Sequence, residues 1–369
     1  MIAVVSFEHF LDDERIYHRQ IKTLIKNGFQ VSYFTRSNSE IDLSTPELSH
    51  VNFPKLTSLK EYTQKIVGYF SGSSPPKVVH IHEPELLDLA STLKIQFGTK
   101  VIYDVHEDYP SLIHTFSRKT KLIKTVKEKF WLEKEKRFLK WVDRIILASP
   151  YIKNSGYDEK GFTPVILENF PTLSMIPKVD FDCNRGNTMI YHGHLGPERG
   201  ISELIQSVLI VSNEIPDISL SLYGSFRTND YQNEILALIK QLSLDQHINW
   251  YGQINHEEIW EKLSESSVGV IPFLDKPLTR LGTPTKLFEY MASGCRIVAS
   301  NLPPMKRFDV NGILMVSPGN IKNLSQCLVE ALQKNSNESL ELNHKKIMDE
   351  YNWETIEHRL IDTYGELLK

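Results

Sequence analysis

Short apolar runs alternate with amphipathic stretches in the first half of the chain. Six of these runs are short and rich in β-branched residues, as expected of buried strands. They span residues 2–7, 31–34, 78–82, 101–105, 144–148 and 165–167. Residues 16–27 follow helical periodicity, and Gly28 is placed to end that helix. Such alternation predicts βαβ units and a parallel sheet.

The same alternation restarts in the second half. Strands are predicted at 189–192, 218–223, 248–251, 268–272, 297–299 and 313–316. Helices are predicted at 201–212, 230–242, 256–266, 286–292 and 321–334. Between the halves, residues 169–187 hold two prolines and no sustained periodicity, so we expect the interdomain linker there. The predicted fold class is α/β, with two successive doubly wound, Rossmann-like sheets.

The length of the chain fits this division. Its 369 residues, of which 41% are hydrophobic, are enough for two cores. Doubly wound sheets bind ligands beyond the carboxyl ends of their strands, so a cleft between two facing sheets would hold two substrates. That arrangement suits a transferase.

Charge and cysteine content argue against several classes of protein. The net charge is -4 and the sequence pI about 6.4, so no overall basic field exists to hold nucleic acid. The three cysteines lie far apart, which argues against a disulfide framework or a structural zinc site. The first apolar run is too short for a signal peptide, and no apolar run reaches the length of a spanning helix. We therefore expect a cytoplasmic protein whose membrane contact, if any, is peripheral.

Residues 189–206 place a predicted strand before a glycine-containing loop, and a helix begins near Gly200. Backbone N–H groups at a helix start bind phosphate oxygens, and Arg199 beside them adds a cation. Gly193 and His194 lie in the same loop. An ordinary glycine-bearing turn is the alternative.

A second candidate for phosphate binding lies within 282–300. Lys286 and Glu289 occupy a short predicted helix. The loop before it contains Thr283, Pro284 and Thr285. Lys286 can neutralise a diphosphate, and Glu289 can hold both ribose hydroxyls because a carboxylate only accepts hydrogen bonds. The alternative is a solvated Lys and Glu in the first turn of the helix.

Six segments, spread over nearly the whole chain, carry a family resemblance. They are DDERIYHRQIKTLIKNGFQV (12–31), VVHIHEPELLDLA (78–90), VIYDVHEDYP (101–110), YHGHLGPERGI (191–201), PTKLFEYMASG (284–294) and YNWETIEHRLIDTYGELL (351–368). Together they resemble the GT-B glycosyltransferases of the retaining family 4, particularly its bacterial surface-polysaccharide branch. The resemblance implies an acceptor-binding domain at 1–172, a donor-binding domain at 186–352 and a terminal helix at 353–369 that packs back on the first domain.

The resemblance also implies roles for residues of the second half. Glu289 is the second glutamate of the family's E-x7-E motif and holds the donor ribose. Arg199 matches the basic residue of its E-[KR]-G turn. The loop that contains Gly252 and Ile254 matches the place where the family meets the nucleotide base.

Two positions depart from the family pattern. Leu281 stands where the first glutamate of the motif would be, so the sugar-ring contacts of that glutamate are not implied here. His194 stands where many members carry arginine. Lys286 would then supply positive charge that residue 194 does not.

His106 follows the run at 101–105 and should project from the carboxyl end of a strand. It resembles the histidine that contacts the donor sugar or the catalytic centre in related enzymes. An imidazole can donate to a sugar hydroxyl or carry a proton from the acceptor. Alternatively, His106 caps the next helix with Glu107 and Asp108. We assign catalysis to His106, Arg199 and Lys286, and the acceptor side to His82, Glu83, Glu107 and Asp108.

Two patterns allow metal binding. His80 and His82 share one face of a strand, and with Glu83 or His106 they could hold an ion. Residues 180–182 spell the D-x-D sequence of metal-dependent transferases, but no predicted strand precedes them. The resemblance implies that no catalytic metal is needed, and we expect no cofactor.

Residues 118–144 are strongly basic, with eleven Lys or Arg against four acidic residues and aromatic residues between them. A helix of this kind can lie on an anionic bilayer. The residues of the predicted membrane patch are Lys121, Lys124, Lys127, Phe130 and Trp131. The other interpretation is a solvated helix whose aromatic side chains pack inward.

Together with these residues, the resemblance implies a retaining glycosyltransferase that moves a hexose or related sugar from a nucleotide-diphosphate sugar to a glycan acceptor. We expect a UDP-sugar donor and a lipid-linked acceptor. The resemblance implies synthesis of capsule, lipopolysaccharide or a related polymer at the inner face of the plasma membrane. The nearest alternative is an epimerase or hydrolase of nucleotide sugars with the same fold. The substitution at Leu281 also leaves open a non-catalytic, nucleotide-binding scaffold. A nicotinamide dehydrogenase is disfavoured because no G-x-G-x-x-G follows a predicted strand.

Overall fold

The computed structural model describes residues 1–117, 119–152, 156–334 and 336–369, and the chain divides into two compact units. Unit 1 contains Met1–Asn169 and Ile356–Lys369, and unit 2 contains Phe170–Thr355. The predicted linker at 169–187 falls almost wholly within unit 2. Near the end of this stretch, Arg185 Nη1 donates to three backbone carbonyls of unit 2, those of residues 266, 293 and 294.

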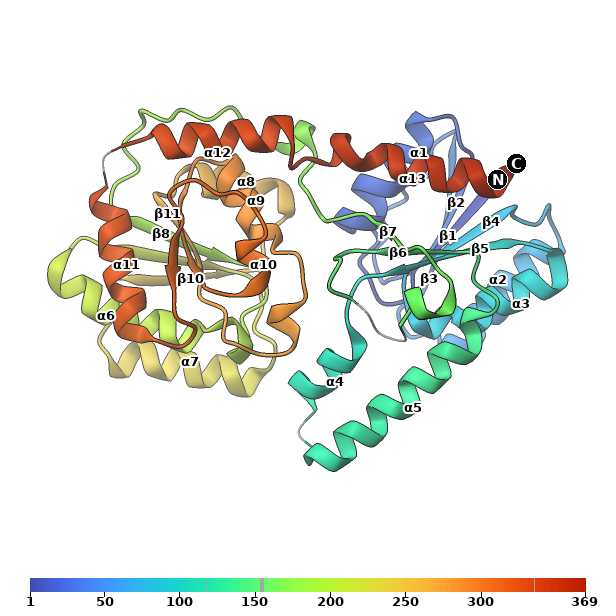
Figure 1. Cartoon of the computed structure of the whole chain (residues 1–369), viewed down its shortest axis with the longest axis horizontal. Helices are drawn as coiled ribbons and strands as arrows, with labels where there is room; N and C mark the ends of the chain where they lie inside the picture. Colours follow the sequence, from blue (N-terminus) through green and yellow to red (C-terminus); the bar gives the residue numbers. More distant parts are fainter. Residues whose placement is uncertain (118, 153–155, 335) are drawn as a thin grey trace. The chain divides into compact units, whose positions relative to one another are not determined.

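Unit 1 is built on a seven-stranded parallel sheet with the order β3-β2-β1-β4-β5-β6-β7 (Figure 1). Its strands are β1 (Ile2–Val5), β2 (Val31–Arg36), β3 (Leu48–Phe53), β4 (Val78–Ile81), β5 (Lys100–Val105), β6 (Arg144–Leu147) and β7 (Val165–Ile166). The order reverses between β1 and β4, and such a switch point is where doubly wound sheets bind ligands.

The helices of unit 1 connect these strands. They are the π-helix η1 (Glu14–Ile21), α1 (Lys22–Lys26), α2 (Leu59–Ser71), η2 (Pro84–Leu86), α3 (Leu87–Phe97), α4 (Tyr109–Phe116), α5 (Lys121–Leu139) and η3 (Asp158–Lys160). Helix α2 shows why they form. Ser58 Oγ accepts from the N–H of Glu61 at its start, and Tyr62, Ile66 and Phe70 recur on its buried face.

Unit 2 contains a second parallel sheet (Figure 1). This sheet has six strands in the order β10-β9-β8-β11-β12-β13. Its strands are β8 (Thr188–His192), β9 (Ser219–Tyr223), β10 (Ile248–Gly252), β11 (Val268–Ile271), β12 (Arg296–Ser300) and β13 (Leu314–Val316). Its helices are η4 (Leu173–Met175), η5 (Pro197–Arg199), α6 (Ile201–Glu214), α7 (Asn229–Gln241), α8 (His256–Ser264), η6 (Leu278–Arg280), α9 (Thr285–Ala292), α10 (Pro303–Lys306), α11 (Ile321–Gln333) and α12 (Glu338–Asp349). Here the switch point lies between β8 and β11.

The last helix, α13 (Trp353–Leu368), contains the boundary between the two units. In unit 1, the Tyr364 hydroxyl lies 2.8 Å from His80 Nδ1. Glu357 accepts from Thr23 Oγ1 and Lys26 Nζ, both at 2.9 Å. The terminal helix therefore packs back on the first domain, as predicted.

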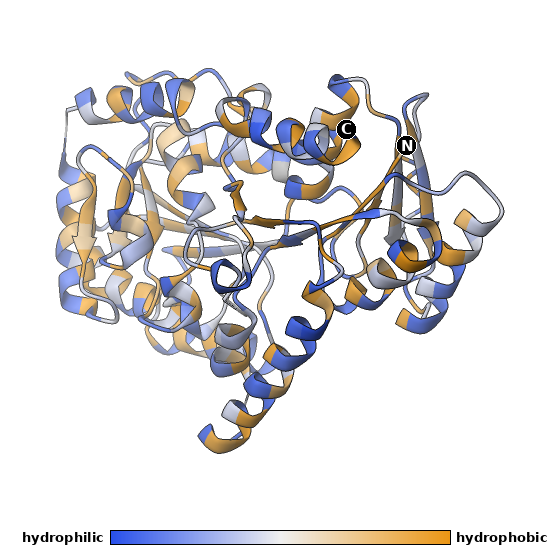
Figure 2. Cartoon of the chain, turned by 45° about the vertical axis from the view of Figure 1, so that its right-hand side comes forward, coloured by the Kyte–Doolittle hydropathy of each residue, from blue (hydrophilic) through white to orange (hydrophobic). Residues whose placement is uncertain are grey.

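Hydrophobic residues concentrate on the strands of both sheets (Figure 2). All four residues of β1 and all four of β11 are buried. Parallel strands read as continuous apolar runs because helices cover both faces of their sheet. The two parallel sheets confirm the predicted α/β class. Among the described residues, no helix combines the length and apolar character needed to cross a bilayer.

Candidate functional site

In unit 2, the loops after β8, β9 and β11 approach one another so closely that glycine is required. Gly200 has φ +70°, and a Cβ there would lie 1.9 Å from the Pro272 carbonyl oxygen. Gly224 has φ +132°, and its Cβ would lie 2.0 Å from the Gly193 carbonyl oxygen. Gly193 itself follows β8 and donates its N–H to Tyr223 O at 2.8 Å. The structure thus forms the predicted strand, glycine loop and helix.

Two predicted cations meet beside this loop. The guanidinium carbon of Arg199 lies 4.5 Å from the centroid of the Phe273 ring, and Lys286 Nζ lies 5.8 Å from the same centroid. Lys286 Nζ is also close to Gly193, where a Cβ would lie 2.7 Å from it. Burial, and then the charge of Arg199, lower the pKa of Lys286 to about 8, while Glu289 opposes the shift. Positive charge is therefore concentrated at the glycine loop.

Glu289 lies one turn after Lys286 on α9 and is 6% exposed. Its Oε2 lies 3.1 Å from Nε2 of His192, the last residue of β8. His192 was not among the predicted site residues, and the only sequence signal for it is its place at the end of a predicted strand. Because His192 and Gly193 mark the end of β8, the cluster lies at the switch point of the second sheet, where Rossmann-like domains bind nucleotides.

The other predicted donor residues lie in loops of unit 2, at the end of β10 and at the start of α9. His194 is exposed; desolvation and then the charges of Arg227, Lys286 and Arg199 lower its pKa, which favours the neutral ring. Gly252 ends β10, and its carbonyl accepts from the N–H of Gly224 at 2.6 Å. Pro284 is buried just before α9, and Thr285 is the first residue of that helix. Ile254 and Thr283 are partly buried loop residues.

In unit 1, a row of hydrogen-bonded side chains follows the ends of β1, β4 and β5. Glu83 Oε1 lies 2.7 Å from His9 Nδ1, and His9 Nε2 lies 3.0 Å from His106 Nδ1. His106 Nε2 in turn lies 3.1 Å from His82 Nδ1. His106 therefore follows a strand as predicted, but both its ring nitrogens contact protein groups. Burial lowers its pKa to about 4, although Asp104 opposes the shift.

Glu83 anchors the loop after β1. Its Oε1 also accepts from Ser6 Oγ at 2.9 Å and from the N–H groups of Phe7 and Glu8, both at 3.0 Å. Burial disfavours the charged form, but the hydrogen bond and charge of His9 prevail and lower the Glu83 pKa to about 2. Glu83 and the neighbouring His82, predicted on the acceptor side, are both buried, so here Glu83 holds the loop that presents His9.

Below this row, Arg15 and Gln20 of η1 bind Asp104 of β5. Arg15 Nε and Nη2 donate to the two carboxylate oxygens at 2.9 and 2.8 Å, and Gln20 Nε2 donates at 2.6 Å. Positions five apart would lie about 140° apart around an α-helix, whereas wider π winding brings them onto one face. Burial disfavours ionisation of Asp104, but Arg15 prevails and holds its pKa well below the usual range.

The sequence allowed a metal site at His80 and His82 with Glu83 or His106. In the structure, the third residue of the group is Asp104 instead. Ligand atoms of His80, His82 and Asp104 lie within 4.8 Å of one another. However, both carboxylate oxygens of Asp104 already accept from Arg15. A metal ion at Asp104 would face this guanidinium, so these residues do not fit a divalent cation. The D-x-D sequence at 180–182 lies in an irregular, largely exposed segment.

Two further acceptor-side predictions lie at the start of α4. Asp108 Oδ2 accepts from Ser111 N at 3.0 Å and from Ser111 Oγ at 2.6 Å, so Asp108 is the N-cap of this helix. The capping role that the sequence left open for His106 thus belongs to Asp108. Glu107 is exposed.

The basic segment forms α5, and its apolar side chains divide between two faces. Trp131 stacks on Tyr109, with ring centroids 4.8 Å apart. Leu122, Val126 and Phe130, which we call the α5 stripe, are 75%, 60% and 75% exposed. Their four-residue spacing places them on one side of the helix.

The predicted basic residues of α5 also differ in their exposure to solvent. Lys121 and Lys127 are exposed, whereas Lys124 Nζ donates to the carbonyl of His114 at 2.8 Å. Trp131 thus packs inward, as the second interpretation predicts, whereas Phe130 faces solvent. Residue 118 of the basic segment lies outside the described residues.

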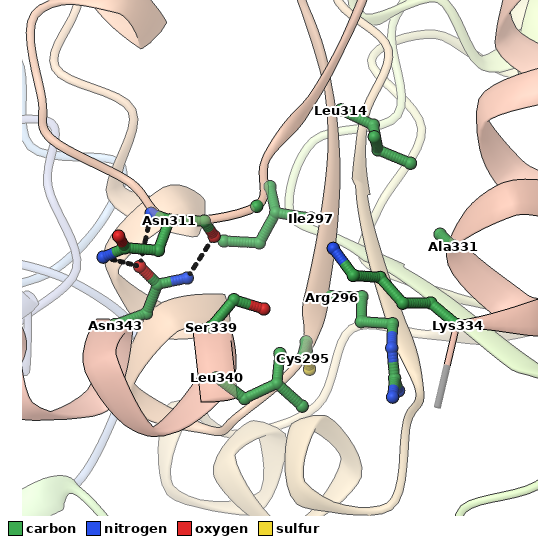
Figure 3. A pocket seen from close by; sticks show the side chains of 11 residues that line it. Cys295, Arg296, Ile297, Asn311, Leu314, Ala331, Lys334, Ser339, Leu340 and Asn343 are labelled. Atoms are coloured by element: carbon green, nitrogen blue, oxygen red, sulfur yellow. Dashed lines mark hydrogen bonds between the residues drawn. The ribbon is translucent and has the colours of Figure 1, made fainter. Parts of the chain in front are cut away.

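A small pocket in unit 2 includes Cys295 and Arg296 at the amino end of β12 (Figure 3). On one side, Asn343 Oδ1 accepts from the backbone N–H of Asn311 at 2.8 Å. None of the predicted site residues lines this pocket. The cluster of Arg199, Lys286 and Glu289 lies instead at the carboxyl ends of strands of the same sheet.

The structure of the chain is similar to several solved structures, of which three are described here. Sucrose-phosphate synthase from Thermosynechococcus elongatus matches with a TM-score of 0.77 and 19% identity, over 100% of this chain and 98% of that one. HepE from Anabaena, in complex with UDP-glucose, matches with a TM-score of 0.75 and 13% identity, over 99% of each chain. The lipopolysaccharide outer core galactosyltransferase WaaB matches with a TM-score of 0.62 and 13% identity, over 98% of this chain and 100% of that one.

Sequence comparison gives the family directly. None of the curated proteins compared with the chain matches it. Two family models do match: Glycosyltransferase Family 4 at residues 14–169 and Glycosyl transferases group 1 at residues 181–352. The first match lies in unit 1 and the second in unit 2. The chain therefore belongs to the family 4 glycosyltransferases of the GT-B fold.

Proposed function

We propose that this glycosyltransferase moves a sugar from a UDP-sugar to a glycan acceptor with retention at the anomeric carbon. The observation that carries this proposal is the meeting of Arg199, Lys286 and Gly193 at the switch point of unit 2. Two cations and a glycine loop suit a diphosphate, and Glu289, one turn after Lys286, suits the adjacent ribose.

The similar structures support the choice of substrates. HepE was determined with UDP-glucose, and WaaB is a galactosyltransferase of the lipopolysaccharide outer core. We infer a UDP-sugar donor and an acceptor used in bacterial surface polysaccharide synthesis.

The chemistry assigned to the site is displacement of a diphosphate. The bond from the anomeric carbon to the diphosphate oxygen breaks, and the nucleoside diphosphate leaves with the electron pair. The acceptor oxygen bonds to the same face of that carbon, and its proton passes to the departing diphosphate oxygen. Arg199 and Lys286 stabilise the charge on the leaving group, an effect worth about 3–4 kcal/mol per donor in other enzymes. We assign His106 to the acceptor hydroxyl, which would take the place of one of the ring's protein contacts.

We propose that these side chains perform the electrostatic work without a divalent metal. Activity should then persist after EDTA treatment and dialysis. Loss of turnover that returns with added Mg²⁺ or Mn²⁺ would contradict this part of the proposal.

We further propose that the acceptor is lipid-linked and that the α5 stripe contacts an anionic membrane. The stripe is exposed and apolar, and exposed Lys127 and Lys129 lie on the same helix. Apolar side chains bordered by lysines match the chemistry of an acidic bilayer surface. In liposome flotation, the protein should float with vesicles that contain acidic lipid. Phe130→Ser should weaken flotation, whereas Ile95→Ser, at a residue of α3 that is 63% exposed, should not.

A thermal-shift panel of UDP-, GDP-, ADP- and dTDP-sugars tests the proposed donor, because a ligand that binds only the native state raises the midpoint. UDP-sugars should give the largest shift. Incubation with and without a glycan acceptor then separates the activities. Free sugar or an epimer without acceptor would indicate a hydrolase or epimerase, and binding without turnover on any acceptor would indicate a scaffold.

A further inference from the structure

Arg227, which the sequence patterns did not single out, lies beside the glycine loop at 193–200 of unit 2, which we call the phosphate loop. Its N–H donates to Leu195 O at 3.0 Å, and Leu195 N donates to Ser225 O at 3.0 Å. Leu195 also forms a parallel bridge with Phe226. These contacts extend the pairing of β8 and β9 beyond the strand ends and fix the backbone of Arg227 against the loop at 193–196.

One buried carboxylate positions the side chain of Arg227. Glu198, 4% exposed, places Oε1 3.1 Å from Arg227 Nη2 and 3.4 Å from Arg199 Nε. A Cβ at Gly196 would lie 2.5 Å from Glu198 Oε2, so the glycine leaves room for this carboxylate. Glu198 therefore brings two guanidinium groups to one side of the loop.

Three cations act on His194 in this loop. Arg227, Lys286 and Arg199 all act on His194 and lower its pKa, with Arg227 the largest of the three after desolvation. Arg227 is 31% exposed and Arg199 is 21% exposed in their side chains, so both remain accessible to a ligand. Arg227, Arg199 and Lys286 therefore bring three cations to the same loop, beside its backbone N–H groups.

We propose that Arg227 is a third cation of the diphosphate site and supplies, from the loop after β9, the positive charge that His194 does not supply. The inference rests on the proposed function, since it assigns a phosphate contact within the same donor site. Glu198 is a positioning residue, because its carboxylate holds the guanidinium groups of Arg227 and Arg199 on the same side of the loop. A planar guanidinium can then bind two phosphate oxygens at once.

Calorimetric titration of UDP and uridine, with no acceptor present, tests this assignment. Arg227→Gln should raise the Kd for UDP about 10-fold to 100-fold, the range expected for one charge-assisted hydrogen bond, and leave uridine binding unchanged. Arg227→Lys should recover part of the loss. Lys322→Gln, at an exposed position of α11, removes one charge elsewhere in unit 2 and should bind UDP like the wild type.

The outcomes distinguish this inference from the proposed function. If the wild type binds UDP and Arg227→Gln binds it equally well, Arg227 lies outside the site and only this inference fails. If Arg227→Gln weakens the binding of both UDP and uridine and also lowers the Tm, Arg227 has a structural role and the inference is again wrong. If the wild type binds none of UDP, GDP, ADP and dTDP, the proposed donor site itself is wrong.

Discussion

Arg15 and Asp104 form an ion pair joined by two hydrogen bonds, and their side chains are 4% and 0% exposed. The pair links helix η1 to the strand that precedes His106. Arg15 Nη1 also donates to Leu167 O at 2.6 Å and to Asn169 Oδ1 at 2.7 Å. The pair therefore connects three segments of unit 1 beneath the row of histidines.

Removing one partner of this pair should destabilise the protein strongly. Asp104→Leu leaves the guanidinium buried without its carboxylate, and we expect the free energy of unfolding to fall by about 3–5 kcal/mol. Urea unfolding followed by circular dichroism measures this. Adding Arg15→Met to Asp104→Leu should recover part of the loss because neither charge then remains. As a control, Lys65→Met in the exposed pair with Glu61 should change stability by less than about 1 kcal/mol.

The two cations at the glycine loop should be required for turnover but not for folding. Lys286→Ala and Arg199→Ala each remove charge near the proposed leaving group, so kcat should fall about 100-fold or more while the Tm changes little. Steady-state kinetics and thermal unfolding of both variants check this. Near-normal turnover in both variants would remove the assignment of these residues to the leaving group.

The pH dependence of kcat/KM for the donor should reveal the ionisation of Lys286. Burial and Arg199 lower its pKa to about 8, so the ammonium is present below that pH and lost above it. The ratio kcat/KM reports ionisations of the free enzyme and should therefore fall as pH rises through about 8. Lys286→Arg should keep its charge and move this loss to higher pH. If kcat/KM of Lys286→Arg falls at the same alkaline pH as that of the wild type, another group is responsible for the loss.

Glycine at position 200 should be required for the phosphate loop. A Cβ would meet the carbonyl oxygen of Pro272 at 1.9 Å, and φ of +70° is a conformation that other residues adopt only with strain. We expect Gly200→Ala to weaken UDP binding and to lower the Tm, as measured by calorimetry and thermal unfolding. Gly282→Ala, where a Cβ meets no atom within 4 Å, is the matched control and should keep the wild-type Tm.

The pattern of residues determined the elements of this protein and much of the proposed donor site. The runs at 2–7 and 268–272 predict strands because parallel strands are buried on both faces, and the structure places β1 and β11 there. Lys286 and Glu289 are one turn apart on a helix, so their common location followed from local spacing. Gly193 and Arg199 belong to a single loop, and their closeness to each other was also local.

Only the tertiary structure decided which strand ends meet. His9 and Glu83 are 74 positions apart, and Arg15 and Asp104 are 89 positions apart, so no local period links them. Their contacts follow from strand order, which depends on packing over whole sheet faces, and from the π winding of η1. Arg227 likewise joins the phosphate loop only because β8 and β9 are neighbours in the sheet. Hydrophobic periodicity encodes which face of an element is buried, but it does not encode which other element covers that face.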